Sequence, residues 1–135
     1  MYAELDRPWD WARVGTIWFG DGLDVLIRVD DPAEEPCFHV IDARANKFDI
    51  AISLKEPKYL RVYEARLTDE AKRALDKFFR ERPKYSCEPT RYDLAVSFWN
   101  TCNPNRAMAV FADESGNTII PDYVNTISRD PYKEK

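Results

Sequence analysis

Apolar and polar residues alternate with a period of two through the first half of the chain, which is typical of β-strands. Residues 16–29, TIWFGDGLDVLIRV, place an Asp21-Gly22 dipeptide between two apolar runs, and this arrangement predicts a β-hairpin. With a two-residue turn, Gly20 pairs with Leu23. The apolar face of this hairpin would then carry Trp18, Leu23, Val25, Ile27 and Val29, and the other face Asp24 and Arg28.

Two further strands, CFHVIDA and KFDIAIS, are predicted after residues 30–36, DDPAEEP, whose two prolines and four carboxylates favour a loop. The predicted register places Ile41 opposite Ile50 and His39 opposite Ile52. Helices or a second copy of the chain would have to cover the opposite face of the sheet. The apolar residues expected on that opposite face are Ile17, Phe19, Leu26, Phe38 and Val40.

The second half of the chain changes to a helical period. Thr68 is a predicted N-cap, and the helix that it begins ends before Pro83. Its apolar stripe is Ala71, Leu75, Phe78 and Phe79. Thr90, with Asp93 three places on, predicts the start of a second helix that ends at Asn103-Pro104. The apolar face of this second helix is Tyr92, Ala95, Val96 and Trp99.

A short fifth strand around residues 60–63 and a late hairpin around residues 114–117 complete the predicted elements. Strands followed by helices indicate an α+β fold, here an antiparallel four- to five-stranded meander followed by two helices packed on one face. The chain length suits one domain. Its expected parts are a single domain 1–135 with the sheet at about 13–64, the helical part at about 68–103 and an irregular or hairpin segment at 104–135.

Composition and charge narrow the classes of function. The chain is 44% hydrophobic and 13% aromatic, with a net charge of −4, which makes nucleic acid an improbable main partner and suits a basic protein partner. Three widely spaced cysteines predict reduced thiols in the cytoplasm. The N-terminal sequence MYAELDRPWDWARVG does not resemble a secretory signal, and no apolar run is long enough for a membrane helix, so we expect a soluble cytoplasmic protein.

Cys37 and His39, the single histidine, are the sharpest chemical candidates. Two residues apart on a strand, they project from the same face, where they could share a metal or act as a thiol and its base. Zinc requires three or four protein ligands, and Cys87 and Cys102 would both have to converge from the helical half. A partly buried structural pair is therefore predicted, with no metal or cofactor. The alternatives are a binding role, and catalysis or a metal site.

Three further motifs admit a functional or a structural interpretation. The acidic residues Asp30, Asp31, Glu34 and Glu35 do not have the spacing of an EF-hand, and a solvated loop is predicted. The basic residues of segment 72–84, among them Arg73, Lys77 and Arg80, suit an exposed helix face, with nucleic-acid contact as the alternative. Trp99 and Asn100 lie where helix termination explains most of the sequence, although both remain binding candidates.

Two short stretches resemble known families. Pro36-Cys37-Phe38-His39-Val40 is similar to the P-x-F-H-V strand, usually P-H-F-H-V, of small bacterial proteins of unknown function, some of them in suspected toxin–antitoxin modules. Trp99-Asn100 with Pro121-Asp122-Tyr123 is similar to W-N…P-D-Y endings in small bacterial proteins. The resemblance implies a compact bacterial or phage domain, and it departs at Cys37, where these families have a histidine.

The sequence contains no G-x-S-x-G motif, Walker loop or dinucleotide fingerprint. We therefore expect a non-catalytic protein–protein interaction module of antitoxin, immunity or inhibitor type, with a protein partner or a homodimer. Tyr2, Trp9 and Trp11 are candidate contact residues, with packing in the core as the alternative. The alternative to an interaction module is a small ribonuclease-like toxin or nucleic-acid-binding protein that uses His39 and the basic helix. A small-molecule or metal-binding sensor domain is a third option.

Overall fold

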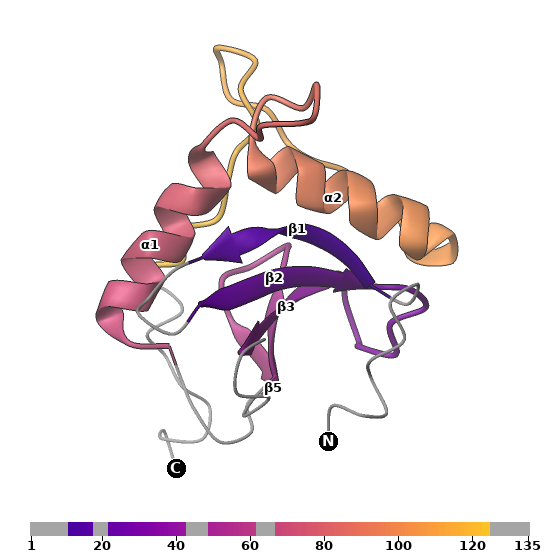
Figure 1. The fold of residues 1–135 in the computed structure, drawn as a ribbon. Helices are drawn as coiled ribbons and strands as arrows, with labels where there is room; N and C mark the ends of the chain where they lie inside the picture. Colours follow the sequence, from indigo (N-terminus) through magenta and orange to yellow (C-terminus); the bar gives the residue numbers. More distant parts are fainter. Residues whose placement is uncertain (1–10, 18–21, 43–48, 62–66, 125–135) are drawn as a thin grey trace.

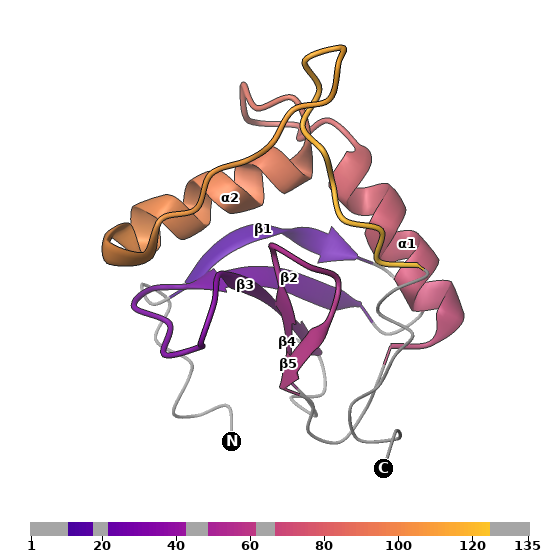
Figure 2. The same cartoon turned by 180° about the vertical axis from the view of Figure 1, so that it is seen from behind.

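The computed structural model describes residues 11–17, 22–42, 49–61 and 67–124. In these ranges one antiparallel sheet with the strand order β1-β2-β3-β4-β5 is followed by two helices, and this confirms the predicted α+β meander (Figure 1). Both helices lie on the same side of the sheet (Figure 2). The elements are β1 (Trp11–Ile17), β2 (Leu23–Arg28), β3 (Cys37–Asp42), β4 (Asp49–Ser53), β5 (Tyr59–Arg61), α1 (Asp69–Arg80), α2 (Arg91–Cys102) and a 3-10 turn, η3 (Pro104–Arg106).

The first hairpin forms, but its predicted register is wrong. Leu23 pairs with Ile17 instead of Gly20, and the ladder shifts at a bulge between Arg13 and Gly15. This register is favoured because Asp24 then accepts hydrogen bonds from the side chains of Arg13 and Thr16. The predicted apolar face of β2 is confirmed by the buried side chains of Leu23, Val25 and Ile27. Residues 18–21, which include Trp18, Phe19 and Asp21 of the predicted turn, lie outside the described residues.

The β3–β4 register is also wrong, by one residue. His39 lies opposite Ala51 instead of Ile52, while Phe38 pairs with Ile52 and Val40 with Ile50. A shift of one residue exchanges the two faces of a strand. Phe38 packs against Phe79 of α1, so Phe38 and Val40 lie on the face that the helices cover, which was one of the two expected coverings, and His39 lies on the opposite face. The connection between these strands, residues 43–48, lies outside the described residues.

Both helices are confirmed, including their first residues. The Thr68 side chain accepts a hydrogen bond from the backbone N–H of Ala71, and the Thr90 side chain accepts one from Asp93, so each threonine is the predicted N-cap. In α1 the predicted stripe is buried, and in α2 the four predicted apolar residues are buried. None of the described helices has the length and apolarity needed to cross a membrane.

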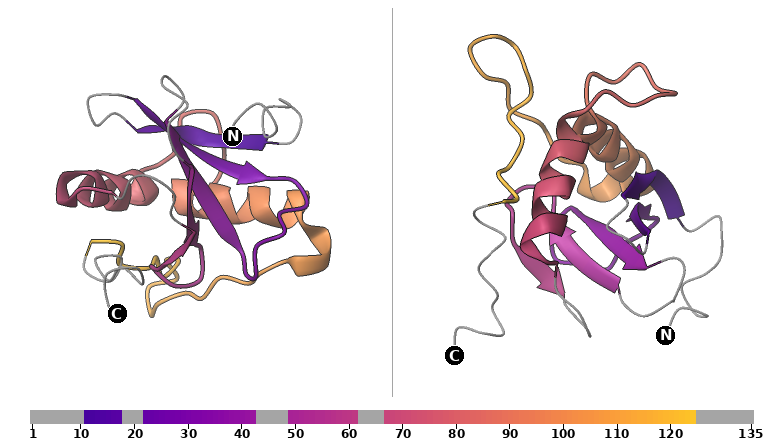
Figure 3. Two further views of the ribbon diagram at one scale, coloured as in Figure 1. Left: turned by 90° about the horizontal axis from the view of Figure 1, so that it is seen from below. Right: turned by 60° about the vertical axis from the view of Figure 1, so that its left-hand side comes forward.

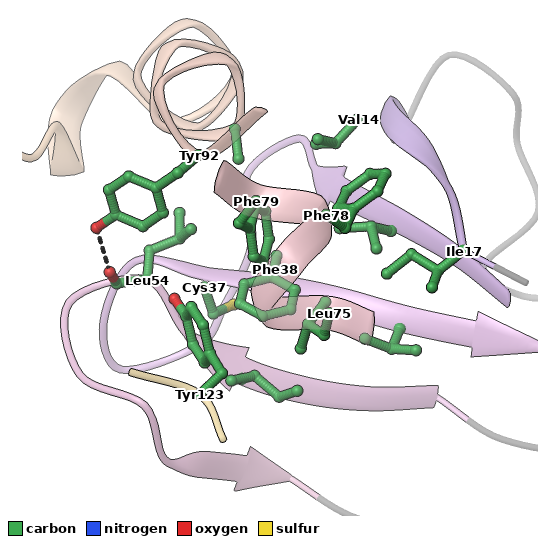
Figure 4. Packing of buried hydrophobic residues seen from close by; sticks show 14 of the residues in the cluster. Val14, Ile17, Cys37, Phe38, Leu54, Leu75, Phe78, Phe79, Tyr92 and Tyr123 are labelled. Carbon is green, nitrogen blue, oxygen red and sulfur yellow. Dashed lines mark hydrogen bonds between the residues drawn. The ribbon is translucent and has the colours of Figure 1, made fainter. Parts of the chain in front are cut away.

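Aromatic side chains join the helices to the sheet. Phe38 meets Phe79 of α1 edge-to-face with 4.9 Å between ring centroids, and it meets Tyr123 at 5.6 Å. The Tyr92 hydroxyl of α2 donates to the carbonyl of Leu54 at 2.6 Å (Figure 4). The core therefore lies between the Phe38 face of the sheet and the two helices.

The segment after α2 runs back along the helices and forms a short projecting arm (Figure 3). We define the arm as residues 107–120. One antiparallel bridge joins Ala112 to Thr118, and the N–H of Ile119 donates to the carbonyl of Phe111 at 2.7 Å. The late hairpin is thus present as a single bridge around the predicted turn. Residues 125–135 lie outside the described residues.

Candidate functional site

Asp31, Cys37 and His39 form a compact buried cluster. The Asp31 Oδ2 lies 2.6 Å from Nε2 of His39 and 3.2 Å from Sγ of Cys37, and the Sγ–Nε2 distance is 3.9 Å. The three atoms thus lie close together, each within 4.8 Å of the other two. Cys37 and His39 share one face of β3, as predicted, and the β2–β3 loop supplies Asp31. The predicted pairing of these two residues is therefore present, with a third member.

The end of α2 fixes the loop that carries Asp31. The loop turns at Asp30, whose φ of 50° lies in the left-handed region that aspartate tolerates better than most residues. The N–H of Asp30 donates to the Cys102 carbonyl at 3.1 Å, and the N–H of Asp31 donates to Oδ1 of Asn103 at 2.7 Å. Asn103 also donates from Nδ2 to the Arg28 carbonyl at 3.0 Å. The position of Asp31 consequently depends on contacts from a distant part of the chain.

Arg106 in η3 supplies the second attachment of the same loop. Its guanidinium donates to the backbone carbonyls of Asp31 and Ala33. The guanidinium also lies over the Trp99 ring, 5.6 Å from the ring centroid, and the Trp99 Nε1 donates to the Arg106 carbonyl at 2.8 Å. We call Asn103 and Arg106 together the loop clamp.

Burial and the close contacts set the protonation of the cluster. Burial by itself would raise the pKa of Asp31, but the hydrogen bond and the charge that His39 supplies outweigh it, together with hydrogen bonds from Ala33 and Cys37, and lower this pKa to about 2. Burial raises the pKa of the Cys37 thiol, and the contact with His39 offsets this only in part. Without a metal, the trio is therefore an ionised carboxylate that accepts from a protonated thiol and from the imidazole, and the thiol is a poor nucleophile.

His39 is enclosed on its own face of the sheet as well. The Trp11 ring meets the imidazole edge-to-face with 5.0 Å between centroids. On the same face Ala51 and Ile41 are buried and Leu26 is half-buried. The imidazole is 1% exposed, so a macromolecule at the surface of this structure could not contact it. A ribonuclease that uses His39 would need such contact, and the geometry does not favour that alternative.

No protein-family model, no curated protein and no solved structure matches the chain. The resemblance to small bacterial proteins with the P-x-F-H-V strand motif therefore stays a prediction.

The other predicted site residues lie elsewhere. Trp99 is fully buried, and Asn100 forms two hydrogen bonds with the backbone of Met108, at 2.8 and 3.0 Å, at the base of the arm. Arg73, Lys77 and Arg80 are exposed on α1, and Arg80 is paired with Asp76 at 3.0 Å. Since these cations are exposed and His39 is buried, the two groups do not share an accessible surface.

Sequence reasoning missed Asp31 as the third member of the cluster and missed the loop clamp. Asp31 was expected in a solvated loop, yet its side chain is 3% exposed. The one available signal was that Asp31 precedes Cys37 by only six positions. A loop this short can fold back so that its side chain contacts the strand that follows. Nothing local in the sequence indicates that Asn103 and Arg106 hold this loop. Cys87 is exposed and Cys102 half-buried, and all three thiols are free.

Proposed function

We propose that this protein is a non-catalytic protein–protein interaction module of antitoxin, immunity or inhibitor type in a bacterial or phage cytosol. The observation that carries the proposal is the exposure of large apolar side chains on the arm. Phe111 is 75% exposed and Ile119 54% exposed, beside the exposed Val110. Apolar groups gathered on a projecting segment, outside a well-packed core, are typical of protein contact surfaces.

The arm is held in place and is not a free tail. At the start of the arm, the Asn100 side chain forms two hydrogen bonds with the backbone of Met108. Further along, the hydroxyl of Thr118 donates to the Asp93 carboxylate at the start of α2, at 2.6 Å. In Figure 1 the α1–α2 loop projects at the same end of the molecule, and this loop carries the fully exposed Tyr85. A braced apolar arm loses little conformational freedom when it binds, which favours affinity.

Charge favours a basic partner. The chain has a net charge of −4, and Asp113 and Glu114 lie exposed at the tip of the arm. Apolar anchors flanked by acidic groups suit a partner surface in which apolar pockets are surrounded by lysine and arginine. The product of a neighbouring gene in the native host is the first candidate, because toxins and their inhibitors are commonly encoded side by side.

The experiment compares the wild-type protein with a Phe111→Ser/Ile119→Ser variant, each purified from the native host with its neighbouring genes intact. The wild-type protein is expected to form a stoichiometric complex, and the arm variant to bind at least about tenfold more weakly. An Arg73→Ser/Lys77→Ser variant is the control, because it removes exposed charge from α1 and leaves the arm intact. A stable wild-type monomer that co-purifies with nothing, or an arm variant that binds as the wild type does, would contradict the proposal. A dimer lost in the arm variant would instead identify a second copy as the partner.

A further inference from the structure

We infer that Asp31, Cys37 and His39 are the protein ligands of one zinc ion. The three side chains offer a carboxylate oxygen, a sulfur and an imidazole nitrogen, which are the three donor types that zinc binds in proteins. Their atoms already face one point, with separations of 2.6, 3.2 and 3.9 Å. Around a tetrahedral zinc these separations would be roughly 3.3 to 3.5 Å, so side-chain shifts of well under about 1 Å would suffice.

Charge balance supports a cation in this buried place. A carboxylate, a thiolate and a neutral imidazole carry two negative charges, which a divalent ion neutralises. The resulting unit is neutral overall and is therefore compatible with side chains that are at most 3% exposed. Binding would convert the Cys37 thiol to thiolate and leave the imidazole neutral, so the thiol proton and the proton of a charged His39 would both pass to solvent. The sulfur and nitrogen donors favour zinc or cobalt over magnesium or calcium, which prefer oxygen ligands.

The surrounding structure holds the donors together without a metal. Two of them are fixed by their positions in β3, and the loop clamp fixes the third by holding the backbone on both sides of Asp31. Three protein ligands leave a fourth coordination place for water or another donor. The competing explanation is a metal-free hydrogen-bonded trio, in which Cys37 donates to Asp31 and no ion enters. The two explanations differ in measurable ways.

The decisive experiment uses the full-length chain with Cys87→Ser and Cys102→Ser, which leaves Cys37 as its single thiol. The protein is unfolded with reductant and chelator, freed of both, and refolded with Co²⁺, with Zn²⁺ or with Mg²⁺. We expect one equivalent of bound Co²⁺, a thiolate-to-cobalt charge-transfer absorption, and a higher Tm with Co²⁺ and Zn²⁺ but not with Mg²⁺. Adding Cys37→Ser, whose hydroxyl can still donate to Asp31, should abolish the absorption and the Tm shift.

The wild-type protein is measured in parallel, so that a negative result counts even if a variant does not fold. Wild-type protein refolded with Co²⁺ that shows no thiolate absorption and no Tm shift overturns the zinc site. An absorption that is present in the wild type and lost in the folded Cys87→Ser/Cys102→Ser protein also overturns it, because the metal would then sit on another thiol. None of these results depends on the arm, so a negative result for the zinc site would not contradict the proposed interaction, and the reverse also holds.

Discussion

The Nε2 atom of His39 lies 2.6 Å from Oδ2 of Asp31, in a place where both side chains are almost completely shielded from solvent. Burying such a pair is costly unless both partners are hydrogen-bonded, because each of them gives up its contacts with water. Asp31 also accepts a hydrogen bond from the N–H of Ala33 at 2.9 Å and one from Cys37. The carboxylate therefore connects the β2–β3 loop to β3, and its removal should affect both.

Asp31→Asn should destabilise the protein measured in the presence of a chelator. The amide cannot carry the negative charge that faces His39, and it places an extra donor in the cluster. We expect a loss of about 3 kcal/mol in the free energy of unfolding, measured by urea denaturation. Asp30→Asn is the matched control, because Asp30 is exposed and asparagine tolerates its φ of 50°. Equal stability of the two variants would show that the buried carboxylate contributes nothing specific.

The same carboxylate should make stability depend on acid pH in the metal-free protein. The pKa of Asp31 is lowered from 3.8 to about 2, so between these values the unfolded chain binds more protons than the folded one. The stabilisation is complete above the unfolded pKa and is lost as the pH falls through the folded one. The lowering corresponds to about 2 kcal/mol, lost between about pH 5 and about pH 2.

The measurement for this pH dependence is the free energy of unfolding at several pH values, for wild type and for Asp31→Asn. Other carboxylates, such as Glu35 with its lowered pKa, contribute to both proteins. The difference between the two curves therefore isolates Asp31. It should shrink steadily toward low pH, and parallel curves would show that the pKa of Asp31 is not lowered in the folded protein.

Local sequence signals predicted the helices well. Thr68 and Thr90 act within a few residues of themselves, and apolar stripes at helical spacing are visible in the sequence. The strand registers were predicted less well, and for β1 one reason is a contact with a distant part of the chain. Gly15 of β1 lies directly against the ring of Phe78 in α1. Neither the alternation of apolar residues nor the Asp-Gly dipeptide predicts this contact.

The sequence predicted two of the three residues of the candidate site, because only those two are related by local structure. Cys37 and His39 share a strand face by simple alternation, so their pairing could be predicted without tertiary structure. Asp31 joins them because its backbone is held by Asn103, which lies 72 positions away in the sequence. Hydrophobic patterning does not reveal such a contact between a loop and a helix end. From the sequence alone, Cys37 and His39 form a pair, and Asp31 belongs to an acidic loop with no visible relation to them.

Asn103→Ala should loosen the β2–β3 loop. The change removes the acceptor for the N–H of Asp31 and the donor to the Arg28 carbonyl, and it leaves these buried groups without those bonds. We expect a loss of about 1 to 3 kcal/mol in stability and faster hydrogen exchange at Asp31. Asn105→Ala, on the exposed surface of η3, is the matched control. Unchanged exchange at Asp31 would show that the loop is held without Asn103.

Gly15→Ala should destabilise the contact between β1 and α1. A Cβ at this position would lie 2.6 Å and 2.8 Å from two ring atoms of Phe78, closer than carbon atoms approach in folded proteins. The Phe78 ring has little freedom to withdraw, because Arg91 lies over it at 4.6 Å and Phe79 packs beside it at 5.6 Å. We expect a loss of about 1 to 3 kcal/mol, measured by thermal and urea unfolding.

Phe78→Leu tests whether the close contact with the Phe78 ring causes this loss, since the smaller side chain leaves room for the added methyl group. By itself Phe78→Leu should destabilise the protein, because it removes buried aromatic surface. Combined with Gly15→Ala, it should cost less than the sum of the two single changes, with a favourable coupling of about 1 kcal/mol in the double-mutant cycle. Strictly additive effects would show that Gly15 is required for the bulge in β1 and not for the close approach of Phe78.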